Sequence, residues 1–463
     1  MSRASFLRGA LGAGAALASS GFPAWSGIAT AQPTDRRGLR GRVLLPGDAG
    51  YASAKQLFDS RFDANSPAAV VQVTSVEDVR AAVALAAESG LRIAPRGGGH
   101  SYVGASAADE TLVIDLRELR DVRYDGGRVT VGAGASLSDV QNGLHRFGQT
   151  LPLGTCATVG ITGLTLGGGI GIESRRHGLS CDRLDSAGIV LPNGELAETS
   201  ATSDPDLFWA LRGGGGQLGV VTSLTFLTCP ATPKDVVRLT FPAERLARVI
   251  TGWADWLSTA DRSAWANIDA STDGHGTMEC AVLLVCPADT GTEHTRTLTA
   301  ATGTDPLTVQ RQTLDHLEAF GALAGGSDAP RTCSVSGSDV VANISSDLAD
   351  RIVETLTMLA DAPGRVLIDP LDGAVRDLPS EATVFPWRDH AAVLQWIIDA
   401  PADTGHWIAD AHRNLGSHST GAYVNYLEPS DSPRRYFADN LDRLRRIRTA
   451  ADPDNRLHPT LAL

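Results

Sequence analysis

The chain has 463 residues, of which 43% are hydrophobic and 20% are charged, and its formal net charge is -13 at pH 7. This length exceeds what a single hydrophobic core serves, so two or more lobes are expected, and the composition is that of a soluble globular protein rather than a disordered or membrane-embedded one. The negative charge, which no run of Lys or Arg on one segment overcomes, argues against a nucleic-acid partner.

The first 31 residues have the pattern of an export signal. A basic start leads into an Ala/Gly-rich apolar stretch that ends in Ala29-Thr30-Ala31, a sequence typical of a cleavage site. Residues 2–7 resemble the twin-arginine export motif, with Ala4 in place of its second arginine. We expect residues 1–31 to be a signal peptide on an exported protein; the alternative is a tail on a cytoplasmic one. No later stretch reaches the roughly 20 apolar residues of a membrane span.

The six cysteines are few for this length. None belongs to a CxxC pair or lies at metal-ligand spacing from a histidine, so a zinc site is not expected. Some of them can form disulfides in an exported protein, and the sequence leaves the pairing open. They are Cys156, Cys181, Cys229, Cys280, Cys286 and Cys333.

Strand and helix patterns alternate in the first half of the chain, which indicates an α/β or α+β lobe. Ser75 caps a helix predicted from Val76 to Ser89. Ser136 begins a second helix, predicted to end at Phe147, with Asp139 at the capping-box position. The other predicted elements are strands at Leu91–Ala94, Leu112–Leu116, Val129–Val131 and Val220–Phe226, a helix at Asp206–Leu211, and a hairpin of Ser186–Leu191 and Glu195–Glu198 around the turn Pro192-Asn193-Gly194.

Glycine becomes rare after Pro230, and residues 231–418 are interpreted as a second domain. Strand patterns in it are Val237–Phe241, Met278–Val285 and Arg365–Ile368, and helix patterns are Arg245–Leu257, Leu348–Ala360 and Ala391–Ile398. The tail, Thr420–Leu463, combines a strand pattern with a charged helix predicted at Phe437–Ala450.

Three glycine clusters, at residues 97–99, 163–171 and 213–216, lie between regular elements. Glycine lets the backbone approach a ligand and turn its N–H groups toward an anion, so such loops commonly cradle phosphates. There is no GxxxxGK[ST] sequence, and neither of the first two clusters opens a helix with an acidic residue at ribose distance. Each cluster alone is compatible with a tight turn. Together they favour a pyrophosphate-bearing nucleotide held outside the Rossmann and P-loop folds.

Two nucleophilic side chains lie in or beside these loops. His100 directly follows RGGG, where an imidazole can attack an electrophilic carbon such as the activated methyl group of a flavin. Cys156 lies in LPLGTCATVGITGLTLGGGIG, residues 151–171, where a thiolate can bond to the flavin ring. Ordinary packing or surface roles for the two side chains are the alternatives.

Six segments in order resemble the berberine bridge enzyme-like branch of the vanillyl-alcohol oxidase / p-cresol methylhydroxylase superfamily. They are RGGGHSYVG (residues 96–104), the Cys156 segment, RHGLSCDRL (176–184), DLFWALRGGGGQLGVVTSLTF (206–226), YVNY (423–426) and DPDNRLHP (452–459). The resemblance implies an α+β fold. Its FAD-binding domain has two subdomains within residues 36–230, completed by residues 419–463, and residues 231–418 are an inserted substrate domain built on an antiparallel sheet flanked by helices.

The resemblance also implies FAD attached through both His100 and Cys156, as in the bicovalent members of the family. Val159 occupies a position where a small Val accompanies oxidases, and Gln217 stands where Asn is more usual. The further FAD-binding residues that we assign are Arg96, Gly97, Gly98, Gly99, Ser101, Thr155, Gly160, Gly163, Gly167, Gly168, Gly169, Gly219, Val220, Val221 and Asn425.

By the same resemblance Tyr426 is the catalytic base, Tyr423 is the second choice, and Asp369 is the carboxylate that partners the tyrosine. A tyrosine can act as a base only if its pKa is lowered or its proton is relayed to a neighbour. Asp369 can equally be a solvated loop residue. Tyr102, Trp387 and Arg388 are assigned to the substrate side of the site.

We therefore expect an FAD-dependent oxidase that acts on a hydroxyl of a carbohydrate, alcohol or secondary metabolite, with molecular oxygen as the acceptor and hydrogen peroxide as the product. Three alternatives remain open: a dehydrogenase with another acceptor, oxidation of an amine or ring closure on the same scaffold, and a flavin binder without catalysis. The sequence gives neither the substrate nor the oligomeric state.

Overall fold

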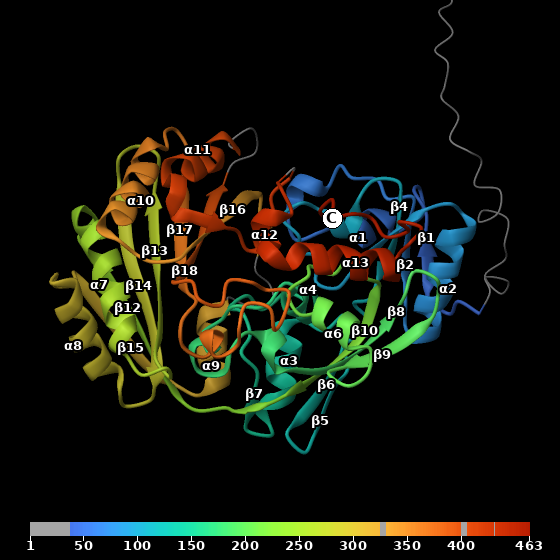
Figure 1. The fold of residues 1–463 in the computed structure, drawn as a ribbon, viewed down its shortest axis with the longest axis horizontal. Helices are drawn as coiled ribbons and strands as arrows, with labels where there is room; N and C mark the ends of the chain where they lie inside the picture. Colours follow the sequence, from blue (N-terminus) through green and yellow to red (C-terminus); the bar gives the residue numbers. More distant parts are fainter. Residues whose placement is uncertain (1–37, 325–329, 400–404, 430) are drawn as a thin grey trace, which may run out of the picture. The chain divides into compact units, whose positions relative to one another are not determined.

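The computed structural model describes residues 38–324, 330–399, 405–429 and 431–463, which form four β-sheets with helices packed on them (Figure 1). The signal peptide predicted at residues 1–31 lies outside the described residues. Among the described helices, none combines the length and the apolarity that crossing a bilayer requires. All six cysteines are free thiols.

The first sheet carries the first glycine loop at the end of one of its strands. Its order is β1-β2-β4-β3, with β2, β4 and β3 parallel and β1 antiparallel to β2. The N-cap of α2 is confirmed, because the Ser75 side chain accepts a 3.1 Å hydrogen bond from the Asp78 nitrogen. The bounds are β1 Arg42–Leu44, β2 Ala69–Gln72, β3 Arg92–Arg96, β4 Thr111–Asp115, α1 Tyr51–Lys55 and α2 Val76–Glu88.

The second sheet is antiparallel, with the order β5-β6-β10-β8-β9. The predicted capping box of Ser136 and Asp139 is present at the start of α3, and the predicted hairpin is the β8–β9 pair. Its strands are β5 Val122–Asp125, β6 Arg128–Gly132, β8 Leu184–Val190, β9 Leu196–Ser200 and β10 Val220–Leu227. The helices here are α3 Leu137–His145, α4 Ile161–Leu166, α5 Ser174–His177 and α6 Pro205–Ala210, and a two-stranded sheet pairs β7 Gln149–Thr150 with β11 Cys229–Pro230.

The largest sheet has eight antiparallel strands in the order β15-β12-β14-β13-β17-β18-β16-β19. Its strands are β12 Lys234–Phe241, β13 Trp265–Thr272, β14 Met278–Pro287, β15 Thr308–Leu314, β16 Ser334–Val341, β17 Gly364–Pro370, β18 Ala392–Asp399 and β19 Ser419–Gly421. One face is covered by α7 Leu246–Thr259, α8 Gly291–Thr302, α10 Ser346–Met358 and α11 Gly405–Leu415, and α9 is His316–Ala324. Figure 1 shows these covering helices on the side away from the first two sheets, so the other face of the sheet is turned toward those sheets.

The helix predicted at Ala391–Ile398 is wrong, because this segment is strand β18. Leu394 and Trp396 face the helix-covered core, whereas Val393 lies in a separate apolar cluster on the opposite face. A strand buried on both faces reads as a continuous apolar run, which periodicity cannot distinguish from a helix.

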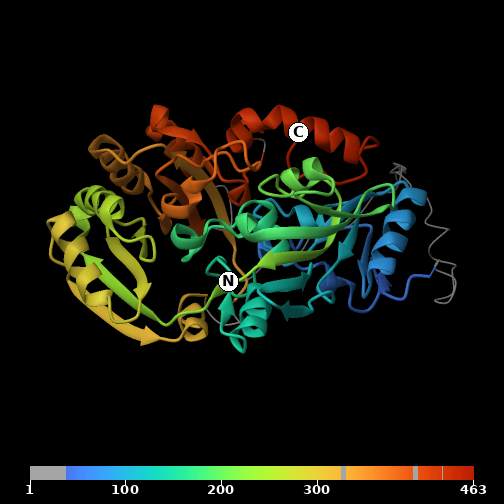
Figure 2. The same cartoon turned by 60° about the horizontal axis from the view of Figure 1, so that its bottom comes forward.

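The C-terminal segment returns to the first half of the chain, where its helices lie in Figures 1 and 2. The Ile93 nitrogen of β3 donates to the Arg456 carbonyl and the His458 nitrogen donates to the Ile93 carbonyl, both at 2.8 Å. The charged helix predicted from Phe437 is two helices, α12 Arg434–Phe437 and α13 Leu441–Ala451, separated where Ala438 adopts a φ of +43°. The predicted domain boundaries at residues 230 and 418 stay a prediction.

Candidate active site

Two glycine loops meet backbone to backbone at the centre of the candidate site. The first loop follows β3 directly after Arg96, and the second precedes α4. A Cβ atom added to Gly98 would lie 2.2 Å from the Gly160 nitrogen, and one added to Gly160 would lie 2.3 Å from the Gly98 nitrogen. Both positions therefore require glycine for steric reasons, and this contact brings the His100 loop and the Cys156 loop together.

His100 and Cys156 converge on one hydroxyl, that of Thr158. The His100 Nε2 atom shares a 3.0 Å hydrogen bond with Thr158 Oγ1, and the Cys156 sulfur lies 3.8 Å from the same oxygen. The ring of Phe58 stacks on the imidazole at 4.0 Å between centroids. Burial lowers the pKa of His100 to about 4, so the imidazole is neutral near pH 7 and keeps a nucleophilic lone pair. Thr158 was not predicted, although it lies two residues after Cys156.

The third glycine cluster joins the first two through α4. The backbone nitrogens of Gly213 and Gly215 donate to the Leu166 carbonyl at 3.0 and 2.9 Å. Because α4 begins at the Gly160 contact and ends at Leu166, all three clusters lie around this one helix. Backbone N–H groups and polar side chains thus gather where a nucleotide can approach the main chain closely.

Several buried polar atoms around these loops have no hydrogen-bond partner, and they show whether the site fits FAD. Arg96 pairs with Asp115 through Nη2 at 2.6 Å, but its Nε and Nη1 atoms have no hydrogen-bond partner among the described residues. The same holds for Thr165 Oγ1 and Gln217 Oε1. Buried polar groups are normally satisfied. These donors and acceptors therefore fit a large polar ligand such as FAD.

The other residues assigned to FAD surround this centre. Ser101 Oγ accepts from the Val103 and Ala105 nitrogens at 3.4 Å, Thr155 is exposed, and Val159 is half-buried. Gly163 has open space at its Cβ position, Gly219 packs against the Val190 carbonyl, and Val220 and Val221 are buried in β10. Their contacts with FAD stay a prediction.

The YVNY motif is bonded to α4 and to the glycines that follow this helix, residues 167–169. The Tyr423 hydroxyl accepts hydrogen bonds from the Gly169 nitrogen at 2.9 Å and from Asn425 Nδ2 at 2.8 Å. Asn425 Nδ2 also donates to the Leu164 carbonyl at 3.0 Å, so both of its hydrogens are used inside the protein. A Cβ atom on Gly167 would lie 2.1 Å from Asn425 Oδ1. Burial raises the pKa of Tyr423 and keeps its hydroxyl protonated, so these contacts give it a structural role.

Tyr426 lies among aromatic rings and beside a carboxylate. Its ring meets those of Tyr423 and Tyr102 edge to face, at 5.0 and 6.1 Å between centroids. Its hydroxyl forms no hydrogen bond within the described part of the chain, which leaves it free for substrate. Burial and, next, the charge of Asp369 raise the pKa of Tyr426 well above its usual value.

Asp369 lies on β17, on the face of the sheet opposite α7, α8, α10 and α11, so its reading as a loop residue is wrong. Asn267 Nδ2 donates to its carboxylate at 3.2 Å. Burial raises the pKa of Asp369 to about 6, which makes it able to exchange a proton near neutral pH. On the neighbouring strand Gln395, which was not predicted, donates to the Tyr102 hydroxyl and to Ser336 Oγ, both at 3.0 Å. A tyrosine, a carboxylate and two hydrogen-bonding side chains thus lie together.

Trp387 and Arg388 are engaged in protein contacts. Arg388 forms two 2.7 Å bonds with the Asp182 carboxylate and one of 2.8 Å with Thr383 Oγ1. Trp387 Nε1 donates to the Ala422 carbonyl at 2.9 Å, next to the YVNY motif. These contacts hold the segment around the motif, and a direct contact of either residue with substrate stays a prediction.

A buried ion cluster lies behind the same motif. Asp339 on β16 is 0% exposed and pairs with His412 Nδ1 at 2.8 Å and with Arg435 at 2.9 Å. His412 Nε2 contacts the Glu428 carboxylate at 3.0 Å, two residues after Tyr426. Burial opposes a charge on the imidazole, but the bonds and charges of the two carboxylates outweigh it and raise the pKa of His412 to about 9.

Two family models match the chain: an FAD binding domain at residues 67–200 and a berberine and berberine-like domain at residues 422–459. An uncharacterized FAD-linked oxidoreductase of Bacillus subtilis (strain 168) is 30% identical over 436 residues, covering 90% of this chain and 95% of the relative. Xylooligosaccharide oxidase of Thermothelomyces thermophilus is 31% identical over 436 residues, covering 84% and 85%.

Solved structures agree on the fold. Xylooligosaccharide oxidase from Myceliophthora thermophila C1, in complex with xylobiose, has a TM-score of 0.82 and 26% identity over 92% of this chain and 99% of its own. Glucooligosaccharide oxidase from Acremonium strictum, which carries a 6-S-cysteinyl, 8α-N1-histidyl FAD, has a TM-score of 0.82 and 21% identity over 91% and 98%. These matches confirm the predicted FAD-binding fold with its antiparallel substrate sheet.

Proposed function

Because the chain belongs to the berberine bridge enzyme-like family of FAD-linked oxidoreductases, we propose that it is an oxidase that oxidises a hydroxyl group of a carbohydrate, alcohol or secondary metabolite. The observation that carries the proposal is Tyr426. Its hydroxyl has no partner within the described residues, and Asp369 acts on it electrostatically. This pairing suits removal of a hydroxyl proton better than oxidation of an amine or ring closure, which remain the alternatives.

His100 and Cys156 are proposed to hold the flavin through covalent bonds. Their convergence on Thr158 places two nucleophiles at one point between the glycine loops. Because Thr158 engages Nε2 of the neutral imidazole, Nδ1 is the nitrogen left for attachment. Glucooligosaccharide oxidase carries both kinds of bond. FAD held by these residues would supply the hydride acceptor for the substrate carbon, and molecular oxygen would be the final oxidant, giving hydrogen peroxide.

The proton of the substrate hydroxyl is proposed to leave through Tyr426 and Asp369. The raised pKa of Tyr426 means that it does not hold a negative charge at neutral pH. It therefore takes the substrate proton only as its own proton moves on, and Asp369, with a pKa of about 6, is the neighbouring acceptor. Tyr102 and Gln395 are proposed to orient the substrate beside this pair, with Tyr423 as the second candidate for the base.

Oxygen is the proposed electron acceptor because a small Val at the position of Val159 accompanies oxidases in this family. Val159 lies beside the contact of the two glycine loops. The curated relatives with assigned substrates include oligosaccharide oxidases. A dehydrogenase that uses another acceptor remains the alternative. Export through the leader at residues 1–31 is part of the proposal; a cytoplasmic location is the alternative.

The test is a substrate panel of hexoses, oligosaccharides, primary alcohols and amines, with two readouts on the purified holoenzyme. Peroxide is measured in air, and reduction of a dye is measured without oxygen. We expect hydroxyl substrates to give one peroxide for each molecule oxidised. Dye reduction without peroxide indicates a dehydrogenase, and turnover of amines alone contradicts the assigned chemistry.

A further inference from the structure

The loop that carries His100 is bordered by residues 57–63, a segment after α1 that no sequence motif predicts to be functional. The Phe58 nitrogen donates a 3.1 Å hydrogen bond to the Gly99 carbonyl. The Phe58 ring stacks on the imidazole of the next residue, with 4.0 Å between the ring centroids and 18° between the ring planes. Phe58 thus contacts both the backbone that presents the imidazole and the imidazole itself.

The same segment continues along the loop beyond the histidine. The Arg61 guanidinium donates to the Tyr102 carbonyl at 3.1 Å, and two bonds of 2.9 and 2.7 Å join it to the Asp59 carboxylate. The Phe62 ring fills the space beside Gly104, where an added Cβ atom would lie 2.5 Å from it. The contact between the segment and the loop is therefore not confined to one residue.

The residues that lead into β16 hold the segment in place. The Thr332 nitrogen donates to the Phe58 carbonyl at 3.2 Å, and the Thr332 carbonyl accepts from the Ser60 nitrogen at 2.8 Å. Arg331 Nε donates to the Leu57 carbonyl at 2.8 Å. None of these bonds involves the loop, so the position of Phe58 is fixed by contacts other than those with the imidazole.

The stacked ring limits how the imidazole of His100 can turn. The outer torsion of a histidine side chain has broad preferences, and the lone pair of a neutral imidazole points in the plane of its ring. The bond to Thr158 fixes Nε2 at 3.0 Å but allows the ring to rotate about that contact. Such a rotation would push the edge of the imidazole into the nearly parallel ring of Phe58. The hydrogen bond and the stacked ring together therefore fix the direction in which Nδ1 points.

We propose that Phe58 is a positioning residue for the attachment of flavin at His100, because its ring holds the imidazole in the orientation in which Nδ1 meets the flavin methyl group. This inference rests on the covalent attachment proposed for the function. In the attachment, one hydrogen of the methyl group and one of the imidazole give way to the N–C bond. Molecular oxygen, the acceptor already proposed, takes up these two hydrogens with their electrons as hydrogen peroxide. The Cys156 thiol forms no hydrogen bond with the segment within the described part of the chain, so its own attachment should not need Phe58.

The test is the flavin content of the His100 peptide and of the Cys156 peptide, measured by tryptic mass spectrometry on protein purified from identical cultures. We expect Phe58→Ala to lower the ratio of flavin-bearing to flavin-free His100 peptide by about two- to tenfold, the range that an aromatic contact represents. The Cys156 peptide should keep its flavin. Phe58→Leu, which retains apolar bulk without a flat ring, should show the same loss, and Phe58→Tyr should restore the wild-type ratio.

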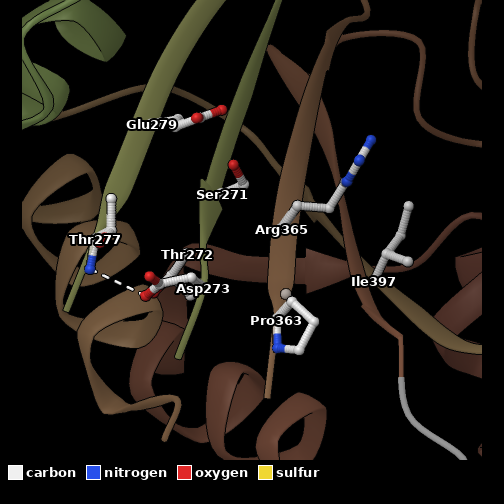
Figure 3. A pocket seen from close by; sticks show the side chains of 9 residues that line it. Ser271, Thr272, Asp273, Thr277, Glu279, Pro363, Arg365 and Ile397 are labelled. Atoms are coloured by element: carbon white, nitrogen blue, oxygen red, sulfur yellow. Dashed lines mark hydrogen bonds between the residues drawn. The ribbon is translucent and has the colours of Figure 1, made fainter. Parts of the chain in front are cut away.

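Two control variants separate positioning from a general loss of stability. Phe62→Ala truncates an equally large ring of the same segment, which packs on Gly104 instead of the imidazole. Ile397→Ala truncates a half-buried apolar side chain in the pocket shown in Figure 3, whose lining includes no residue of the segment or of the loop. Both variants should keep the wild-type ratio at His100. Equal losses in Phe58→Ala and Phe62→Ala, or equal losses on both flavin peptides, would overturn the positioning role.

The peptide ratio needs no turnover, so failure of the positioning role and failure of the proposed function are distinguishable. Flavin on both peptides of the wild type, with an unchanged His100 ratio in Phe58→Ala, would overturn the positioning role and retain the covalent attachment. A wild-type His100 peptide without flavin would overturn both. The expected ratios in the variants, without peroxide from any substrate, would retain the positioning role and reject the oxidase.

Discussion

The backbone nitrogen of Gly169 donates a 2.9 Å hydrogen bond to the hydroxyl of Tyr423, which lies 254 residues further along the chain. Asn425 donates to the same oxygen and also to the Leu164 carbonyl. Helix α4, the glycines that follow it and the YVNY motif are thus one structural unit. Tyr426 is the last residue of that motif.

Tyr423→Phe should therefore destabilise the protein. The substitution leaves the Gly169 nitrogen and one Asn425 hydrogen without an acceptor in a buried place, at a cost of about 1–3 kcal/mol. Chemical denaturation followed by flavin and tryptophan fluorescence measures the loss. Tyr124→Phe is the control, because it removes a single 3.2 Å bond from the Gly127 nitrogen on an outer hairpin. Equal losses in the two variants would contradict the structural role of Tyr423.

Tyr426→Phe should lower kcat by about 10²–10⁴-fold, the range for loss of a general base, while the protein keeps its flavin. The dependence of kcat on pH tests whether Asp369 is the proton acceptor for Tyr426. Wild-type kcat should fall as the pH drops through about 6, where Asp369 becomes protonated and can no longer accept a proton. Asp369→Asn should be slow at every pH and lack this acid limb. A variant that keeps the limb would assign it to another group.

His412 should make stability depend on pH on the alkaline side. Its pKa of about 9 in the folded protein exceeds the value of about 6.5 in the unfolded chain, so the protonated form favours folding. The stabilisation, about 3 kcal/mol at most, is fully present below pH 6.5 and is lost as the pH rises toward 9. Unfolding free energies measured from pH 6 to pH 10 should show this decline in wild type. The decline should persist in His418→Gln, which alters an exposed pair with Asp347, and be absent in His412→Gln.

Gly160→Ala should be strongly destabilising. Gly160 has an ordinary φ of -77°, so the penalty is purely steric: its Cβ would lie 2.3 Å from a backbone nitrogen. Separating the two loops should cost about 1–3 kcal/mol and lower flavin content. Gly321→Ala in α9 is the matched control, since nothing lies within 4 Å of its Cβ position and the change should be neutral or stabilising. Similar thermal midpoints for the two variants would contradict the loop contact.

Thr158→Val should lower the fraction of flavin that is covalently bound, because it removes the hydroxyl that holds His100 Nε2. Thr158→Ser keeps the hydroxyl and should restore the wild-type fraction. The ratio of bound to released flavin after denaturation measures the effect independently of turnover. An unchanged fraction in Thr158→Val would show that the hydroxyl does not position His100.

Helix caps and turn sequences, which involve only neighbouring residues, made much of the fold predictable. Ser75 and Ser136 mark their helices by capping, and Asn193-Gly194 marks its hairpin, because these signals depend on a few adjacent residues. Strand β18 was mistaken for a helix because its burial on both faces comes from the remote helices α10 and α11 on one side and the YVNY region on the other. No adjacent residue carries that information.

The residues of the candidate site also divide into those that local sequence motifs reveal and those that only the fold reveals. His100 and Cys156 were predictable because each lies within a glycine-rich motif. Thr158 and Gln395 were not predictable from the sequence. Thr158 matters through its contact with His100, and Gln395 through its contact with Tyr102, and both partners are distant in the sequence. The sequence allows Asp369 to be either a catalytic partner or a loop residue, because its position depends on the register of β17 in the sheet.

The most direct test of the account is whether flavin is bonded to both His100 and Cys156. The purified protein is denatured in acid, free small molecules are removed, and the absorbance spectrum and tryptic masses of the pellet are recorded. The account predicts a yellow pellet in which the His100 peptide and the Cys156 peptide are joined through one flavin. Flavin on the His100 peptide alone would remove Cys156 from the assignment, and a colourless pellet from protein that released no flavin would contradict the account.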